Sequence, residues 1–338
     1  DWRESQALNP EKKPAWLTPT VNGLANELMT RVNSAAAING MALTALCLLA
    51  SKTQTMSKTE LAQAMRDYLA LFELAPYSAN ATLPKEDADA LLEHTLSLKR
   101  LQVSEDNYGT LISPMPDNAV FLTYYRNNII HLFALPGIVM TAIFAHGKLE
   151  KTNILQLIAA LYPLLQRELF LHLSQDEALA YTAQLIDAFK QTGMLQQKGR
   201  YLALPEADSE QFHSSWLLSR CMQETLQRYA VVLTILKRDK SISRNALERE
   251  SKTVAERLSK LYGMHSPEFY DKNVLSSFIS ALRDNHWLDA GEDGSLKYSE
   301  EASALRKDIM ALVWPEIVQH LQQDILQADR EAGADEKV

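Results

Sequence analysis

The chain has 338 residues, of which 46% are hydrophobic and 22% charged, as is ordinary for a soluble globular protein of two or three domains. Glycine is scarce: its 11 residues are about 3% of the chain against an average near 7%, which disfavours glycine-rich phosphate loops and doubly wound folds. The many Ala, Leu, Gln and Glu residues predict a mainly α-helical protein. The net charge of −8 argues against non-specific binding to nucleic acid, which needs a basic face.

The two ends of the chain differ from its middle. Residues 1–39 are expected to form a linker and a helical lead-in. The chain starts at Asp1, without Met and without the charged-then-apolar start of a signal peptide, so we expect a segment of a longer protein. Residues 327–338, "QADREAGADEKV", are polar and are expected to be a disordered tail.

A repeat of 93 residues runs through the middle of the chain. An apolar helix end, a polar loop and a new amphipathic helix recur in three segments: "LTALCLLASKTQTMSKTELAQAMRDYLALF", "MTAIFAHGKLEKTNILQLIAALYPLL" and "LTILKRDKSISRNALERESKTVAERL". Lys58, Lys151 and Arg244 take equivalent places, 93 residues apart at each step.

The second half of the repeat contains a further amphipathic helix and then a hairpin. The expected hairpins are "VSEDNYGTLIS", "LQQKGRYLAL" and "LDAGEDGSLKYS". Gly109, Gly199 and Gly294 lie at the expected turns, where a positive φ is easily reached only by glycine. The order helix, helix, helix, hairpin is typical of a winged helix.

We therefore predict a mainly α-helical protein of tandem winged-helix-like repeats linked by long helices. The three units are expected at residues 40–136, 137–229 and 230–326. The stretch "FLTYYRNNIIHLFALPG" (Phe121–Gly137) is interpreted as the long helix that leads from the first hairpin into the second unit.

A winged helix suggests DNA binding, but the hairpins argue against it. "SEDNYG" and "DAGEDGS" carry acidic residues, whereas a wing that contacts the phosphate backbone of DNA needs Lys or Arg. Between Lys237 and Lys260 there are eight Lys and Arg against four Asp and Glu, which is also typical of a solvated helix face. We therefore expect no nucleic-acid partner, and an independent tandem winged-helix module that binds protein or nucleic acid remains the alternative.

Residues with catalytic or metal-binding potential are scattered. No two of the eight histidines have the i, i+4 spacing of a helical zinc site, and there is no P-loop or serine nucleophile elbow, so no metal and no cofactor is expected. Ser174 and Glu177 are interpreted as a capping box at the start of a helix. Cys47 and Cys221 lie in apolar or amphipathic segments and are interpreted as small buried hydrophobic residues.

A catalytic His-x4-Asp motif, in which Asp orients a His general base for acyl transfer, is absent. The residues five positions after the eight histidines are, in chain order, Lys99, Pro136, Lys151, Glu177, Leu218, Tyr270, Gly291 and Ile325. None of them is Asp, so no catalytic residue is assigned to this chain.

Four blocks nevertheless occur in a familiar order: "KPAWLTPTVNGLANELMTRVNSAAAINGMALTALCLLAS", "YLALFELAPYS", "LLEHTLSLKRLQV" and "TYYRNNIIHLFALPG". Together they resemble the carboxy-terminal part of bacterial glycerol-3-phosphate acyltransferase. The resemblance covers most of the chain and is strongest before Gly137.

The resemblance implies a parent enzyme that transfers a fatty acyl group from acyl-ACP or acyl-CoA to the sn-1 hydroxyl of glycerol 3-phosphate, giving lysophosphatidate. It implies a peripheral location on the cytoplasmic side of the bacterial inner membrane. The family's catalytic and substrate-binding motifs lie in the domain before this region. We therefore expect this region to be inactive alone, to support or regulate the preceding acyltransferase domain, and to meet the substrates only through it.

The apolar run from Ile129 to Ala145 raises the question of a membrane anchor. Its 17 residues are at the low end for a membrane span, and Pro136–Gly137 interrupts the run. The equivalent helix of the next unit carries Arg220, Glu224 and Arg228. Both helices are therefore expected to be buried core, although a contact of the region with the membrane surface stays open.

The Tyr-Tyr-Arg-Asn-Asn block (Tyr124, Tyr125, Arg126, Asn127 and Asn128) supplies the candidate site residues. In the structural interpretation the tyrosines pack, and the polar side chains bond carbonyls or a carboxylate at a domain seam. In the functional interpretation Arg126 binds a phosphate or an acidic partner. The structural interpretation is favoured.

Overall fold

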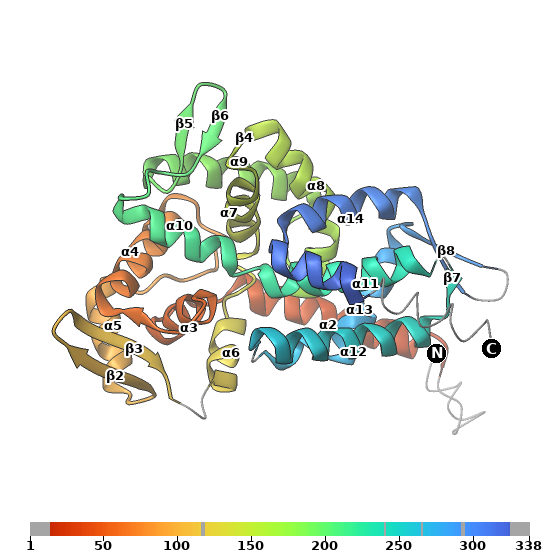
Figure 1. Cartoon of the computed structure of the whole chain (residues 1–338), viewed down its shortest axis with the longest axis horizontal. Coiled ribbons are helices and arrows are strands. Elements are labelled where there is room, and N and C mark those ends of the chain that lie inside the picture. The colour runs from red at the N-terminus through yellow and green to blue at the C-terminus, as the bar shows by residue number, and fades with distance from the viewer. Residues whose placement is uncertain (1–13, 116–118, 240, 265, 292–294, 325–338) are drawn as a thin grey trace.

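Three small antiparallel sheets recur along a mainly helical chain (Figure 1). A computed structural model describes residues 14–115, 119–239, 241–264, 266–291 and 295–324. Within them, helices predominate and each sheet has three strands, which confirms the expected mainly α-helical class.

The same series of elements occurs three times. The first comprises α3 (Gly40–Ala50), β1 (Met56–Ser57), α4 (Lys58–Leu74), α5 (Ala88–Ser97), β2 (Leu101–Asp106) and β3 (Gly109–Pro114). The second comprises α7 (Ala134–His146), β4 (Lys148–Glu150), α8 (Lys151–Leu169), α9 (Gln175–Gln191), β5 (Gln196–Lys198) and β6 (Tyr201–Ala203). The third comprises α11 (Gln223–Arg238), β7 (Ser241–Ile242), α12 (Arg244–Tyr262), the 3₁₀ helix η1 (Pro267–Tyr270), α13 (Lys272–Asp284), β8 (Leu288–Ala290) and β9 (Leu296–Tyr298).

Further helices flank these series: α2 (Leu17–Ser34) precedes the first, and α6 (Ala119–Asn127), α10 (Glu210–Arg220) and α14 (Glu300–Leu312) follow the three hairpins. Residues 315–324 are also helical. Lys58, Lys151 and Arg244 are the first residues of α4, α8 and α12, which confirms the alignment of the chain with itself. The assignment of the series to the winged-helix fold, and the unit boundaries, stay predictions.

Each sheet has the same strand order, β1-β3-β2, β4-β6-β5 and β7-β9-β8. The second strand of each hairpin is central, and a strand of two or three residues from the preceding loop pairs with its free edge. Gly109 and Gly199 have φ angles of 133° and 64° at the first two hairpin turns. Gly294 lies outside the described residues. The three sheets lie at the periphery (Figure 1).

The core is built around the first helix of each series. Ten of the eleven residues of α3 are buried, as are residues 134–143 of α7 and nearly all of α11 up to Leu236. Helices α3 and α7 are apolar on all sides and are therefore surrounded by other helices, whereas α11 also buries polar side chains such as Arg228. The expectation that the apolar half of Phe121–Gly137 is core is thereby confirmed. Among the described residues, no helix is both long and apolar enough to cross a bilayer.

The expected continuous helix over Phe121–Gly137 is wrong. Helix α6 ends at Asn127 and α7 begins at Ala134, with turns between them. Pro136 has no amide hydrogen to donate, which suits the first turn of a helix and disfavours a helix interior. Asparagine competes for backbone hydrogen bonds and favours helix ends, so Asn127 and Asn128 favour the break.

Close packing surrounds the start of α7. A Cβ atom on Gly137 would lie 2.6 Å from Sγ of Cys221 and 2.9 Å from Cγ of Met222, at the junction of α10 and α11. Helix α10 packs against both α7 and α4, so it joins the first and second series. The predicted capping box of Ser174 and Glu177 is present at the start of α9.

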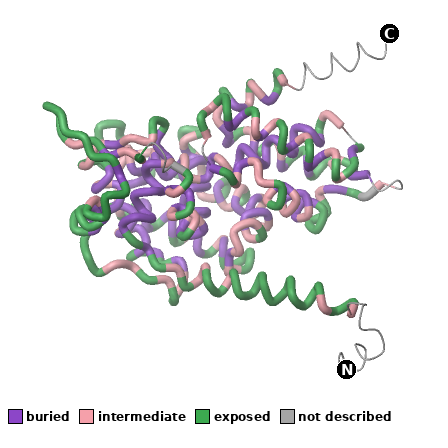
Figure 2. Tube along the Cα trace, turned by 90° about the horizontal axis from the view of Figure 1, so that it is seen from below, coloured by how far each residue is buried: buried purple, intermediate pink, exposed green. Residues whose placement is uncertain are grey.

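Helix α2 lies along one edge of the molecule and is exposed over almost its whole length (Figure 2). Its carboxyl end is fixed to the body, where Asn33 Nδ2 donates to the carbonyl of Leu169 (2.7 Å). The expected tail, residues 327–338, lies outside the described residues.

Candidate functional site

The Tyr-Tyr-Arg-Asn-Asn block ends α6, and the structure divides it between the surface and the interior. Tyr124 is 68% exposed, and Asn128 is also exposed. Tyr125 is half-buried, and its ring meets the edge of the Phe121 ring at 4.8 Å between centroids. Of the five candidates, Arg126 and Asn127 are the ones that turn into a polar seam between helices.

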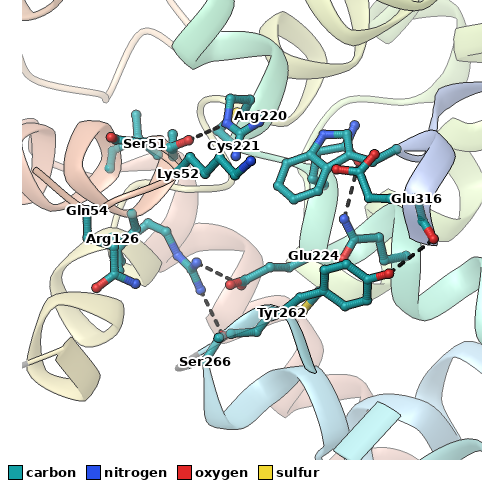
Figure 3. A pocket seen from close by; sticks show the side chains of 18 residues that line it. Ser51, Lys52, Gln54, Arg126, Arg220, Cys221, Glu224, Tyr262, Ser266 and Glu316 are labelled. Carbon is teal, nitrogen blue, oxygen red and sulfur yellow. Dashed lines mark hydrogen bonds and ion pairs between the residues drawn. The ribbon is translucent and has the colours of Figure 1, made fainter. Parts of the chain in front are cut away.

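Arg126 is buried and joins three parts of the chain (Figure 3). Its Nη1 donates to Oε2 of Glu224 at the start of α11 (2.8 Å), and its Nη2 donates to Oγ of Ser266 before η1 (3.2 Å). Its Nε and Nη2 also donate to Oδ1 of Asn127 at 3.2 and 3.1 Å. A guanidinium has five hydrogen-bond donors in one plane. The bonds of Arg126 to Glu224 and Ser266 therefore connect α6 to the third series.

Glu268 in η1 receives hydrogen bonds from the same network. Asn127 Nδ2 donates to its Oε1, and Ser266 Oγ donates to its Oε2 at 2.7 Å. Burial alone would raise the pKa of Glu268, but the bonds from Ser266 and Asn127 and the charge of Arg126 together hold that pKa below its usual range. The network is therefore stabilised with Glu268 ionised.

A second buried arginine contacts the same network. Arg228 in α11 forms an ion pair with Glu168 at the end of α8, and it also donates to the carbonyl of Glu268 at 3.4 Å. Burial alone would lower the pKa of Arg228, but the charge of Glu168 and its hydrogen bond raise that pKa above its ordinary value. Arg228 therefore stays charged inside the fold.

A cavity of about 240 Å³ adjoins these groups and also touches Asn33 and His131. His131 Nε2 lies 2.9 Å from the carbonyl oxygen of Asn33, so this nitrogen carries the hydrogen and donates it. Burial lowers the pKa of His131 to about 4, against a smaller opposing effect of this hydrogen bond. The imidazole is therefore neutral at neutral pH.

A larger cleft of about 460 Å³ also has Arg126 and Glu224 in its lining (Figure 3). Arg220 at the end of α10 reaches its wall, with the guanidinium carbon 4.7 Å from the Trp216 ring centre and 4.1 Å from that of Trp314. Its Nε donates to the carbonyl of Ala50 at 2.5 Å. Burial lowers the pKa of Arg220, against the opposing charge of Glu316.

The cleft combines positive and apolar groups in its lining. Lys52 and Arg220 can bind an anionic group, and Leu46 and Leu49 can contact an apolar one. Burial raises the pKa of the Cys221 thiol to about 12, so this group is not a thiolate at neutral pH. The cleft can therefore bind a ligand or a partner segment.

A buried carboxylate that sequence reasoning missed lies elsewhere, between α4 and α10. Ser214 Oγ donates to Oδ2 of Asp67 at 2.5 Å, and Gln63 Nε2 donates to its Oδ1 at 2.9 Å. Burial raises the pKa of Asp67, against the lowering effect of both bonds. The i, i+4 spacing of Gln63 and Asp67 can be recognised in the sequence. Ser214, however, lies 147 residues after Asp67, and no local sequence pattern indicates that the two side chains meet.

Among the described residues, no group of three or more His, Cys, Asp or Glu side chains is arranged so that it could bind a metal ion. The described residues define a mainly α-helical protein of three similar series of elements, joined through a buried polar seam.

Comparison with known proteins identifies the family. The family model described as the glycerol-3-phosphate acyltransferase C-terminal region matches residues 1–291, and the chain belongs to this family. A glycerol-3-phosphate acyltransferase of Alteromonas mediterranea is 66% identical over 322 residues, which are 95% of this chain and 39% of the relative. One of Pseudoalteromonas atlantica is 52% identical over 323 residues, which are 96% of this chain and 40% of the relative. The chain thus spans about two fifths of the length of these relatives.

Proposed function

We propose that this chain is the carboxy-terminal helical region of a glycerol-3-phosphate 1-O-acyltransferase and that it supports or regulates the catalytic domain that precedes it. The observation that carries the proposal is the family membership over residues 1–291. Both relatives are named as the acyltransferase and are more than twice as long as this chain.

The reaction proposed for the full-length protein is acyl transfer from acyl-ACP or acyl-CoA to the sn-1 hydroxyl of glycerol 3-phosphate. This region does not take part in the chemistry, because none of its eight histidines has an Asp five positions further on. Its partner is the acyltransferase domain of the same polypeptide, and the substrates reach it only through that domain. The protein acts as a peripheral protein on the cytoplasmic side of the bacterial inner membrane.

Within this function we assign the seam a structural role. Arg126 is already bonded to Glu224, Ser266 and Asn127, so binding a phosphate there would have to displace these partners. Loss of buried, charge-assisted hydrogen bonds is expensive, which favours a seam that holds the helices in place.

Nucleic-acid binding, the alternative, is not favoured by the third series. Arg238 forms ion pairs with Asp239 and Glu250, and Arg244 forms one with Glu248. These two cations of the basic segment are therefore neutralised by neighbours of the same segment.

An acyl-transfer assay tests the proposal. The full-length protein is expected to acylate glycerol 3-phosphate, and the region alone is expected to give no product with either acyl donor. Activity of the region alone would contradict the proposal that the preceding domain performs the reaction and that this region does not. Absence of activity in a folded full-length protein would overturn the assignment of the reaction. A salt-dependent DNA shift at micromolar concentration or below would instead support the alternative.

A further inference from the structure

Helix α2 presents an apolar stripe that no described residue covers. None of its eighteen residues is buried. Val21, Leu24, Leu28 and Val32 are 54%, 59%, 53% and 63% exposed. Their spacing of three, four and four residues places them on one face of the helix. A row of large apolar side chains at this exposure marks an interaction surface.

The stripe points away from the body formed by the described residues. The half-buried residues of the last turns, Thr30 and Asn33, lie on the opposite side of the helix. Asn33 bonds to Leu169 and His131, and Ser78 Oγ donates to the carbonyl of Ser34. The helix is thus fixed to the body by its polar face at its carboxyl end, and no side chain of the described residues covers its apolar face.

The sequence of α2 is poorly suited to an isolated helix. It contains Gly23, three Thr and three Asn, all of which have low helix propensity. Its amino end has no side-chain cap. Helices of this length are marginal in water even with strong helix formers. The stability of α2 must therefore come from packing of its apolar face.

We propose that the stripe Val21–Leu24–Leu28–Val32 is the surface on which the preceding part of the acyltransferase polypeptide docks. The inference rests on the proposed function and gives it a contact surface. The family is described as the carboxy-terminal region of the enzyme, so in full-length members the preceding chain joins on the side of α2. That preceding chain is the larger part of the protein, since the matched parts are 39% and 40% of the relatives.

The charges of α2 favour a protein partner over a lipid surface. Glu27 and Arg31 are its two charged residues, and they pair with each other at 2.6 Å. Helices that lie on anionic membranes carry several Lys or Arg on the polar face, which α2 lacks. The apolar face is therefore suited to another apolar protein surface.

Hydrogen exchange on the full-length acyltransferase tests the proposal. The amides of α2 are expected to be protected at low protein concentration and without lipid. Replacing Leu24→Glu together with Leu28→Glu keeps good helix formers but puts two charges on the stripe. We expect this double variant to increase exchange within α2 about tenfold or more, because two leucines that docking would bury no longer hold the contact. The matched control, Asn22→Glu with Asn26→Glu, has the same spacing and added charge off the stripe, and it should leave exchange unchanged.

Several results would overturn the docking surface, and the first needs no variant. Rapid exchange throughout α2 in the unaltered full-length protein would do so. Protection that requires vesicles of phosphatidylethanolamine and phosphatidylglycerol would identify a lipid surface instead. Protection that grows with protein concentration would identify a second copy. An acyl-transfer assay on the same unaltered sample separates the two proposals: an active enzyme with an unprotected α2 contradicts only the docking surface, and an inactive folded protein contradicts the proposed function.

Discussion

Arg228 and Glu168 form an ion pair that joins α11 to α8 with water almost excluded, since their side chains are 5% and 11% exposed. The pair connects the second and third series of helices near the Arg126 network. Two charges in such surroundings are stable only together, because each alone would be a buried ion without a counterion.

Removing one member of this pair is expected to destabilise the region strongly. Glu168→Gln keeps the shape but leaves Arg228 charged and uncompensated, so the free energy of unfolding should fall by about 3–5 kcal/mol in urea denaturation. Lys198→Met is the control, because Lys198 and Glu206 are an exposed pair at 3.0 Å and such pairs contribute at most about 1 kcal/mol. Equal effects of the two substitutions would show that the interior around Arg228 is hydrated.

Substitution of Arg126 should act on the fold rather than on substrate. Arg126→Ala leaves Glu224 and Glu268 without their cation, so we expect a loss of about 3 kcal/mol or more in the free energy of unfolding. In the full-length enzyme the KM for glycerol 3-phosphate should stay unchanged at temperatures where the variant is folded. Tyr124→Ala, two positions away and 68% exposed, should change stability by less than about 0.5 kcal/mol. A well-folded Arg126→Ala enzyme that had lost only glycerol-3-phosphate affinity would contradict the structural role.

Gly137→Ala should be destabilising although alanine is the better helix former. The new methyl group would meet Cys221 Sγ at 2.6 Å and Met222 Cγ at 2.9 Å, and relief of such overpacking costs about 1–3 kcal/mol. Gly23→Ala in α2 is the matched control, because a Cβ there meets no atom within 4 Å. That control should be neutral or stabilising by up to about 1 kcal/mol. Thermal denaturation of both variants tests the difference, and a more stable Gly137→Ala would show that α7 can move away from the α10–α11 junction.

His131 should make the stability depend on pH between about 4 and 6.5. Its pKa is about 4 in the folded protein because of burial, against about 6.5 in an unfolded chain. In this range the unfolded state binds the proton and the folded state does not, so stability falls as the pH falls, by about 3 kcal/mol over the whole range. His131→Gln removes the titrating group and should reduce the slope of unfolding free energy against pH.

The control for this slope is Asn128→Gln, an exposed substitution that removes no titrating group and should leave the slope unchanged. Other groups titrate in the same acid range, so the measured quantity is the difference in slope between each variant and the parent. An identical slope in His131→Gln would mean that the imidazole is accessible to protons in the folded state.

Much of the fold was predictable because its signals are local. The spacing of apolar residues gave the helices, and the similarity of residues around Lys58, Lys151 and Arg244 gave the repeat. The strands β1, β4 and β7 were missed, since two or three residues are too few to show alternation. The break between α6 and α7 was also missed, although Pro136 and the Asn127–Asn128 pair are signals for it.

The site was predictable only in part. The block that contains Arg126 stood out by its composition, and a seam was the favoured interpretation of it. The partners Glu224 and Ser266 lie 98 and 140 residues further along the chain, and no local pattern indicates them. The exposed stripe of α2 has the same spacing as a buried helix face, so sequence alone does not distinguish the two.

The three buried helices α3, α7 and α11 bear on how the chain unfolds. Helix α10 packs on α4 as well as on α7, α14 contacts α7, and Arg167 of α8 pairs with Asp284 of α13. Each series is therefore completed by neighbours from another, unlike the repeats of a solenoid, which add one by one along an axis. A chain cut between two series would expose an apolar helix on the remaining part. The three series should accordingly be lost in one cooperative transition, and a variant that lacks one series should leave the other two with an uncovered buried face.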